Sequence, residues 1–116
     1  MILLTFIETS FFTKAITTLF TDEEYGKIQD DLMLNPIKGD LIQGTGGLRK
    51  IRFGLTQGKS GGVRILYYYT DEHGRIYMIA VYPKSKKDSL TNAEKAVFKK
   101  LIEQLKQELK DGQSII

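Results

Sequence analysis

The fold is decided by three stretches in the middle of the chain, Leu48-Arg-Lys-Ile-Arg-Phe53, Val63-Arg-Ile-Leu-Tyr-Tyr-Tyr69 and Arg75-Ile-Tyr-Met-Ile-Ala-Val-Tyr82. Their many β-branched and aromatic residues favour strands. Asp71-Glu-His-Gly74, between the last two, is typical of a hairpin turn. The three stretches therefore predict an antiparallel meander, which Pro83 closes because proline cannot continue the hydrogen-bonded ladder.

Alternation along these strands predicts which side chains share a face, since successive residues point to opposite sides of a sheet. Lys50 and Arg52 then face one way, and Ile51 and Phe53 the other. In the next strand, the side with Arg64 also carries Leu66 and Tyr68, and the opposite side carries Val63, Ile65, Tyr67 and Tyr69.

The segment before the meander predicts one strand and two helices. Residues 2–7 form an apolar run of strand length, and Glu8-Thr9-Ser10 offers a helix cap. Thr21-Asp-Glu-Glu24 matches a capping box for a second helix, which should end at Asn35-Pro36. The apolar stripes at helical spacing are Phe12, Ile16, Leu19 and Phe20 in the first helix and Tyr25, Ile28 and Leu32 in the second.

A third helix should follow the meander. Thr91-Asn-Ala-Glu94 is another capping box, and apolar residues at helical spacing follow it. The helix should end at Gly112. The resulting order, β-α-α-β-β-β-α, predicts an α/β (α+β) fold in a single domain, residues 1–116, with its helices packed on one face of the sheet. The other face should stay partly open and expose Lys50, Arg52 and Arg64, with Lys84 just past a strand end. The stripe of the third helix consists of Val97, Leu101, Leu105 and Leu109.

Composition narrows the function classes. The 116 residues include no cysteine, which excludes disulfides, thiolate zinc sites and cysteine nucleophiles. Neither a signal peptide nor a membrane span fits the N-terminal stretch, so we expect a cytoplasmic protein without membrane contact. Residues 48–87 contain nine Lys and Arg but only two acidic residues, whereas residues 1–47 contain three basic and seven acidic residues. The basic middle third favours a polyanionic partner, above all nucleic acid.

Other motifs carry little chemistry. A phosphate loop needs four residues between its glycines, and Gly54 and Gly58 are separated by three. His73 is the one histidine and lies in the predicted hairpin turn, which excludes a Ser-His-Asp triad and a histidine zinc site. We expect neither a bound metal nor another cofactor. The tyrosines are more typical of sheet packing than of base stacking, although Tyr68 shares a face with Arg64.

The remaining candidate site is the basic cluster of Lys50, Arg52, Arg64 and Lys84. Such a cluster can bind phosphate by charge alone. It can also cleave RNA without a metal, because the substrate's 2′-hydroxyl serves as the nucleophile. Cleavage needs a base for the hydroxyl proton, cations for the crowded phosphate and an acid for the leaving oxygen.

The chain resembles the RelE/HigB toxins of bacterial toxin–antitoxin pairs, most closely the HigB branch. The resemblance rests on Gly44-Thr-Gly-Gly-Leu-Arg-Lys-Ile-Arg52, Gly61-Gly-Val-Arg-Ile-Leu-Tyr-Tyr68 and Ile79-Ala-Val-Tyr-Pro-Lys84, in that order after a helical hairpin. It implies a toxin that enters the ribosomal A site and cuts mRNA there, without a metal, until an antitoxin binds it. A HigA-like helix-turn-helix antitoxin is the partner it implies.

The resemblance also assigns roles. It makes Arg64 the phosphate-stabilising arginine, Lys50 and Arg52 the general base or its cationic support, and Lys84 the basic residue after the last strand. No tyrosine follows Tyr82, and Pro83 replaces a common glycine. The general acid therefore stays open among Tyr68, Tyr82 and Lys84. The residues expected to contact RNA outside the catalytic set are Arg49, Tyr68, Tyr82, Lys86 and Lys87.

Three functions are compatible with these features. The first is a ribosome-dependent mRNA endonuclease toxin, which the convergence of cations favours. The second is a gyrase inhibitor like the ParE toxins of the same fold, which catalyses nothing. The third is an RNA-binding module without cleavage.

Overall fold

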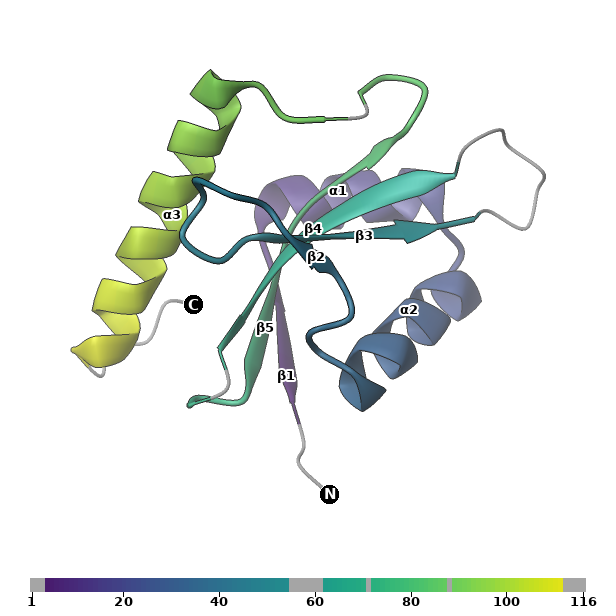
Figure 1. The fold of residues 1–116 in the computed structure, drawn as a ribbon. Coiled ribbons are helices and arrows are strands. Elements are labelled where there is room, and N and C mark those ends of the chain that lie inside the picture. The colour runs from purple at the N-terminus through teal and green to yellow at the C-terminus, as the bar shows by residue number, and fades with distance from the viewer. Residues whose placement is uncertain (1–3, 55–61, 71, 88, 112–116) are drawn as a thin grey trace.

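The computed structural model describes residues 4–54, 62–70, 72–87 and 89–111, and shows one mixed sheet with three helices (Figure 1). The strands are β1 (Thr5–Glu8), β2 (Asp40–Leu41), β3 (Arg49–Phe53), β4 (Val63–Thr70) and β5 (Arg75–Pro83), in the spatial order β1-β5-β4-β3-β2. Neighbours are antiparallel except β1, which lies parallel to β5. The predicted α+β class and the antiparallel meander are confirmed.

Two helices follow β1 as predicted, α1 (Ser10–Leu19) and α2 (Asp22–Leu34). The Thr9 side chain caps α1 by accepting a hydrogen bond from Phe12 N, and the predicted capping box of Thr21 and Glu24 begins α2. The predicted stripes of both helices face the sheet. Their buried members are Phe12, Ile16, Phe20, Ile28 and Leu32.

The third helix, α3 (Asn92–Lys110), begins at the predicted capping box but lies on the other face of the sheet. In Figure 1 it stands across the sheet from α2. The prediction that the helices share one face was therefore wrong. The physical reason is that both faces of β4 are apolar: Leu66 and Tyr68 need a cover of their own, which Ile102 and Leu105 of α3 provide.

Two further sequence-based predictions need correction. Val97 is 67% exposed, and the face of α3 toward the sheet instead includes Phe98 and Ile102. The two-residue strand β2 was not predicted, because its pairing with β3 is long-range and its sequence carries no strand-length apolar run. The predicted ends at residues 2–3 and at Gly112 lie outside the described residues, as does Gly58 of the rejected phosphate loop.

An irregularity in β5 sets which of its side chains share a face. Leu66 pairs with Ala80, but the next residue, Tyr67, pairs with Met78, so Ile79 is an extra residue in β5. Such a bulge leaves a backbone carbonyl to be satisfied elsewhere. The Thr9 hydroxyl donates to Ile79 O at 2.7 Å, which ties the start of α1 to the bulge.

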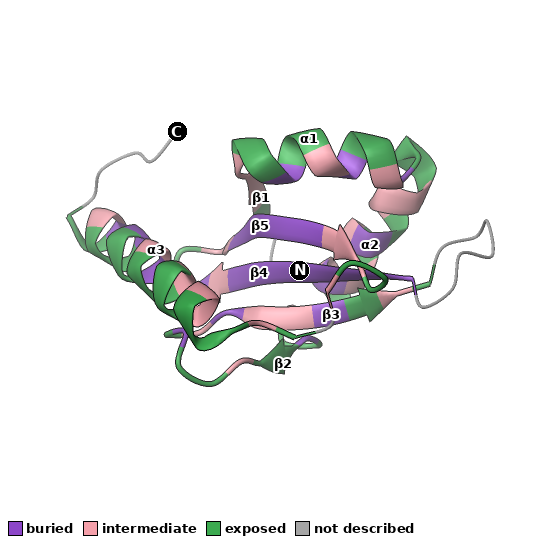
Figure 2. Cartoon of the chain, turned by 90° about the horizontal axis from the view of Figure 1, so that it is seen from above, coloured by how far each residue is buried: buried purple, intermediate pink, exposed green. Residues whose placement is uncertain are grey.

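The sheet separates two apolar clusters. One joins α1 and α2 to one face of the sheet, and the other joins α3 to the opposite face. Figure 2 shows the buried colour running along β4 and β5 in the middle of the sheet, while β2 at the edge is exposed. Across the described part of the chain, no helix is both long and apolar enough to cross a membrane.

Candidate functional site

The candidate site is built on a row of side chains that crosses the three central strands. Arg52 of β3 lies directly opposite Arg64 of β4, and Arg64 lies directly opposite Tyr82 of β5. Directly opposed residues point to the same face, with Cα atoms about 4.5–5.5 Å apart. The predicted face for Lys50, Arg52 and Arg64 is therefore correct. It is the face that α3 covers in part.

The other two predicted catalytic residues lie at the border of this row. Lys50 lies two residues before Arg52 in β3, in the neighbouring row on the same face. It pairs with Leu66 of β4 on one side and with Asp40 of β2 on the other. Lys84 directly follows β5, and its backbone N–H donates to Gly62 O at 3.1 Å, beside the start of β4. Lys84 is thus fixed near the strand end that precedes Arg64.

Exposure separates these cations. Arg52 and Lys84 are exposed, and Lys50 and Tyr82 are half-buried. Arg64 is only 4% exposed, so the expectation of an open arginine on a bare sheet face was wrong. A guanidinium placed centrally in the sheet, between Arg52 and Tyr82 and on the side of α3, loses its access to bulk water. The same burial limits its motion and strengthens its field on any nearby anion.

A polar pocket of about 270 Å³ opens beside the row. It brings Lys50 and Arg52 of the sheet together with Lys95 from the first turns of α3. Among the described residues of the wall, Asp40 contributes the one carboxylate, and Ser89 and Leu90 lie just before α3. Lys95 was missed by sequence reasoning, because it is distant from Arg52 along the chain and its helix was expected on the other side of the sheet.

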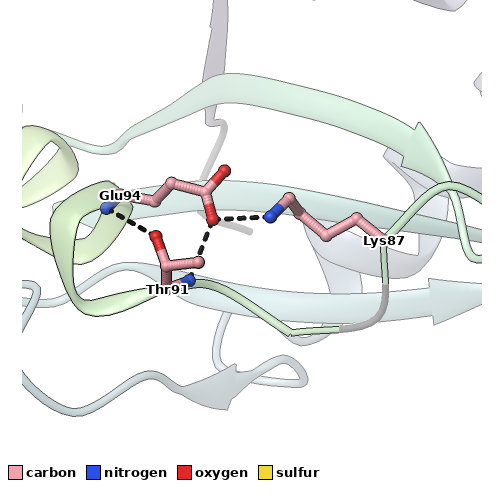
Figure 3. A network of polar contacts seen from close by, with 3 residues as sticks. All are labelled: Lys87, Thr91 and Glu94. Atoms are coloured by element: carbon pink, nitrogen blue, oxygen red, sulfur yellow. Dashed lines mark hydrogen bonds and ion pairs between the residues drawn. The ribbon is translucent and has the colours of Figure 1, made fainter.

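An apolar pocket of about 280 Å³ adjoins the polar one, with Leu90 in the wall of both. Leu66, Ala80 and Tyr82 form its sheet side, and Lys86 and Lys87 lie at its border. The Lys87 ammonium donates to Glu94 Oε1 at 2.6 Å (Figure 3). This hydrogen bond lowers the pKa of Glu94. The same carboxylate accepts a hydrogen bond from Thr91 N and so helps to cap α3.

Two of the predicted RNA contacts lie apart from the row. Arg49 points to the α1–α2 face, where its Nη1 donates to Gly39 O at 2.7 Å and to Ile37 O at 3.2 Å. Tyr68 is 8% exposed and stacks on Tyr77, with ring centroids 6.2 Å apart. It is four residues from Arg64 along β4, about 13 Å at the usual strand rise.

Metal-binding side chains do not gather among the described residues: none of them form a group of three or more His, Asp or Glu close enough to hold an ion. His73 lies exposed in the turn between β4 and β5, as its position in the sequence predicts.

Comparison with known proteins identifies the family. Residues 6–113 match the family described as the RelE toxin of the RelE/RelB toxin–antitoxin system. The chain belongs to the RelE toxin family. The match to the RelE family spans nearly the whole of this chain, including all the elements that form the site.

Solved RelE structures have the same fold. An arginine double mutant of E. coli toxin RelE in the free state matches with a TM-score of 0.59 and 19% sequence identity, covering 82% of this chain and 95% of that one. A chain from the intact E. coli RelBE toxin–antitoxin complex matches with a TM-score of 0.55 and 20% identity, covering 69% of this chain and 95% of that one. At such identities the similarity concerns the RelE fold, and the HigB branch remains a prediction.

Proposed function

We propose that this RelE-family chain is a ribosome-dependent mRNA endonuclease that acts by 2′-hydroxyl attack and needs no metal ion. The row of Arg52, Arg64 and Tyr82 carries the proposal, because it aligns two cations and a phenol across rigid central strands. An inhibitor that only binds a protein has no need for this alignment. The family match and the basic charge of the middle third support the same function.

Each role follows from the position of the side chain. Arg64, buried and central, stabilises the charge that develops on the scissile phosphate. Lys50 and Arg52 border the open pocket, where Lys50 takes the proton of the 2′-hydroxyl and Arg52, which stays protonated, supports it by charge.

The position of Tyr82 favours it as the general acid. It is the direct cross-strand neighbour of Arg64, whereas Tyr68 lies far along β4 against Tyr77. Lys84, exposed after β5, serves as a phosphate contact, and it remains the alternative acid. Tyr82→Phe should lower the cleavage rate at neutral pH, and Lys84→Ala should weaken RNA binding more than it lowers the rate.

Two arginines of one strand give a matched test of the proposal. Arg52→Ala removes a cation from the site face, and Arg49→Ala removes one from the opposite face. Cleavage of ribosome-bound mRNA should fall on the order of 100-fold with Arg52→Ala, the usual cost of one electrostatic contact to a transition state. Arg49→Ala should lower the melting temperature while the folded protein keeps its cleavage rate. Equal rates for the two variants would contradict the assignment.

The product ends test the mechanism. Attack by the 2′-hydroxyl leaves a cyclic or 3′-phosphate on the upstream fragment, and EDTA should not reduce cleavage. Primer extension on translated mRNA after brief induction locates the cuts. A 3′-hydroxyl product would require an activated water and would overturn the mechanism, and intact mRNA in arrested cells would favour the gyrase inhibitor.

A cognate antitoxin, of the HigA-like helix-turn-helix type, is the proposed partner of this cytoplasmic toxin. Helices α1 and α2 cover the face of the sheet opposite to the site cations, and the first turn of α2 is acidic. A basic antitoxin segment could therefore bind α1 and α2 without repulsion from the site cations. Its bulk would then exclude the toxin from the ribosomal A site. A complex in which Arg52 and Lys84 stay accessible supports this route, and one in which antitoxin carboxylates pair with them refutes it.

A further inference from the structure

The polar pocket beside the central row contains a cation that the proposed mechanism does not use. Lys95 comes from α3, and the pocket joins it to Lys50 and Arg52 of β3. Among the described residues, three cations and one carboxylate, that of Asp40, line a cavity of about 270 Å³. The pocket keeps an excess of positive charge, which favours an anion inside it.

Two other lysines on or beside α3 have partners in the chain. The Lys87 ammonium is held by Glu94 at 2.6 Å, and Lys106 donates to Gly46 O at 2.8 Å. Within the described residues, the Lys95 ammonium has neither a hydrogen bond nor an ion pair in the chain. Its side chain is nevertheless half-buried. A lysine stem packed against the fold, with its charge directed to a cavity, is positioned for a ligand.

The fold also fixes where Lys95 stands. The capping box of Thr91 and Glu94 determines where α3 begins, and Lys95 follows it directly. Leu90 packs with the apolar cluster under α3, which holds the chain just before the helix against the sheet. Lys95 is therefore carried by a rigid element, and its distance from β3 does not depend on a loose loop.

We propose that Lys95 completes, with Lys50 and Arg52, a binding pocket for a phosphate group of the RNA, so that α3 takes part in holding the substrate. The inference rests on the proposed function, since it assigns the ligand of this pocket to the same RNA. Phosphate is the matching ligand because three separate cations of the wall can share its oxygens. Lys95 is a binding residue here and takes no part in proton transfer.

The test uses the full chain and ribosome-bound mRNA. Lys95→Met keeps an unbranched stem of similar length and removes the charge, so it separates charge from packing. Lys95→Arg restores the charge. Lys100→Ala is the control, because Lys100 is exposed on the same helix and lies outside the pocket wall. All variants should melt at nearly the wild-type temperature.

Lys95→Met should lower kcat/KM for cleavage about 10-fold, and the loss should shrink as salt is raised because it removes a phosphate contact. Lys95→Arg should recover most of it, and Lys100→Ala should match the wild type. A higher KM with an unchanged kcat would assign the phosphate to RNA that the toxin binds away from the cut. A lower kcat would assign the phosphate to the strand that is cut. Either result supports the phosphate pocket.

A Lys95→Met rate equal to that of Lys100→Ala, in a protein whose cleavage still depends on Arg52, would overturn the inference and leave the proposed function intact. Absence of cleavage by the wild type would instead overturn the proposed function. A melting temperature that falls with Lys95→Met and with Lys95→Arg alike would assign Lys95 a structural role and refute the pocket.

Discussion

The two faces of the sheet are built for different purposes. On the α1–α2 face, the core includes Phe12, Leu32 and Tyr67, all at 0% exposure. Burial there raises the pKa of Tyr67, and burial with the Glu8 hydrogen bond raises that of Tyr25, which keeps both phenols neutral. On the α3 face, the core ends partway along the strands and gives way to cations and pockets. The comparison indicates that one face stabilises the protein and the other leaves room for a ligand.

Mutations on the two faces should accordingly separate stability from activity. A core substitution should lower the free energy of unfolding without changing the rate per folded molecule. A substitution in the pocket should do the opposite. Four substitutions test this separation, and their expected effects range from several kcal/mol of stability to a small shift in melting temperature.

Leu32→Ala should have the largest effect. Leu32 is fully buried between α2 and the sheet, and its truncation removes apolar contacts and leaves a cavity. Such changes cost about 2–5 kcal/mol of unfolding free energy. Urea denaturation followed by circular dichroism measures this loss. An unchanged midpoint would mean that the α1–α2 face does not carry the stability that its burial implies.

Arg64→Ala should lower both activity and stability, because Arg64 belongs to the site face but is as buried as a core residue. Cleavage should fall on the order of 100-fold if Arg64 makes the proposed phosphate contact. The unfolding free energy should also fall, since truncation leaves space in a packed layer. Both quantities should also be measured for Arg52→Ala. Because Arg52 is exposed, its removal should lower the cleavage rate but not the free energy of unfolding. A fully stable Arg64→Ala protein would contradict the burial of this side chain.

Tyr67→Phe tests how the α1–α2 face holds the chain before β2. The Tyr67 hydroxyl accepts a hydrogen bond from Gly39 N at 2.8 Å and donates to Pro36 O at 2.8 Å. Removing it leaves the buried Gly39 N–H without its acceptor, which costs about 1–3 kcal/mol. Thermal unfolding should show the loss, and the cleavage rate should not change. A lower rate at equal stability would connect this loop to the site.

Glu94→Gln should have the smallest effect, with a size that depends on pH. Its hydrogen bond from Lys87 lowers the pKa of Glu94 below the ordinary 4.5. A carboxyl whose pKa is lowered in the folded state stabilises it above the unfolded pKa, and this contribution is lost as pH falls through the folded pKa. The wild type should therefore exceed Glu94→Gln in melting temperature at pH 7, and the difference should shrink as the pH falls below the ordinary 4.5 and through the lowered folded-state pKa. A difference that persists in acid would assign it to capping alone.

Local patterns were sufficient for most of the elements. The capping boxes at Thr21 and Thr91 and the alternation in β3 and β4 depend on neighbours in the sequence, and the structure confirms them. The same alternation correctly predicts that Lys50, Arg52 and Arg64 share one face of the sheet. The family resemblance at residues 44–52, 61–68 and 79–84 also agrees with the RelE match.

Tertiary structure decided what depends on distant contacts. The bulge at Ile79 puts Tyr82 and Tyr77 on one face, although their odd spacing would place them on opposite sides of a regular strand. The sequence also does not predict the face on which α3 packs, because an amphipathic helix can cover either face of a sheet that is apolar on both. That choice buried Arg64 and brought Lys95 to Lys50 and Arg52. Sequence patterns specify the direction of a side chain within its own element, whereas its exposure and its neighbours depend on which elements pack together.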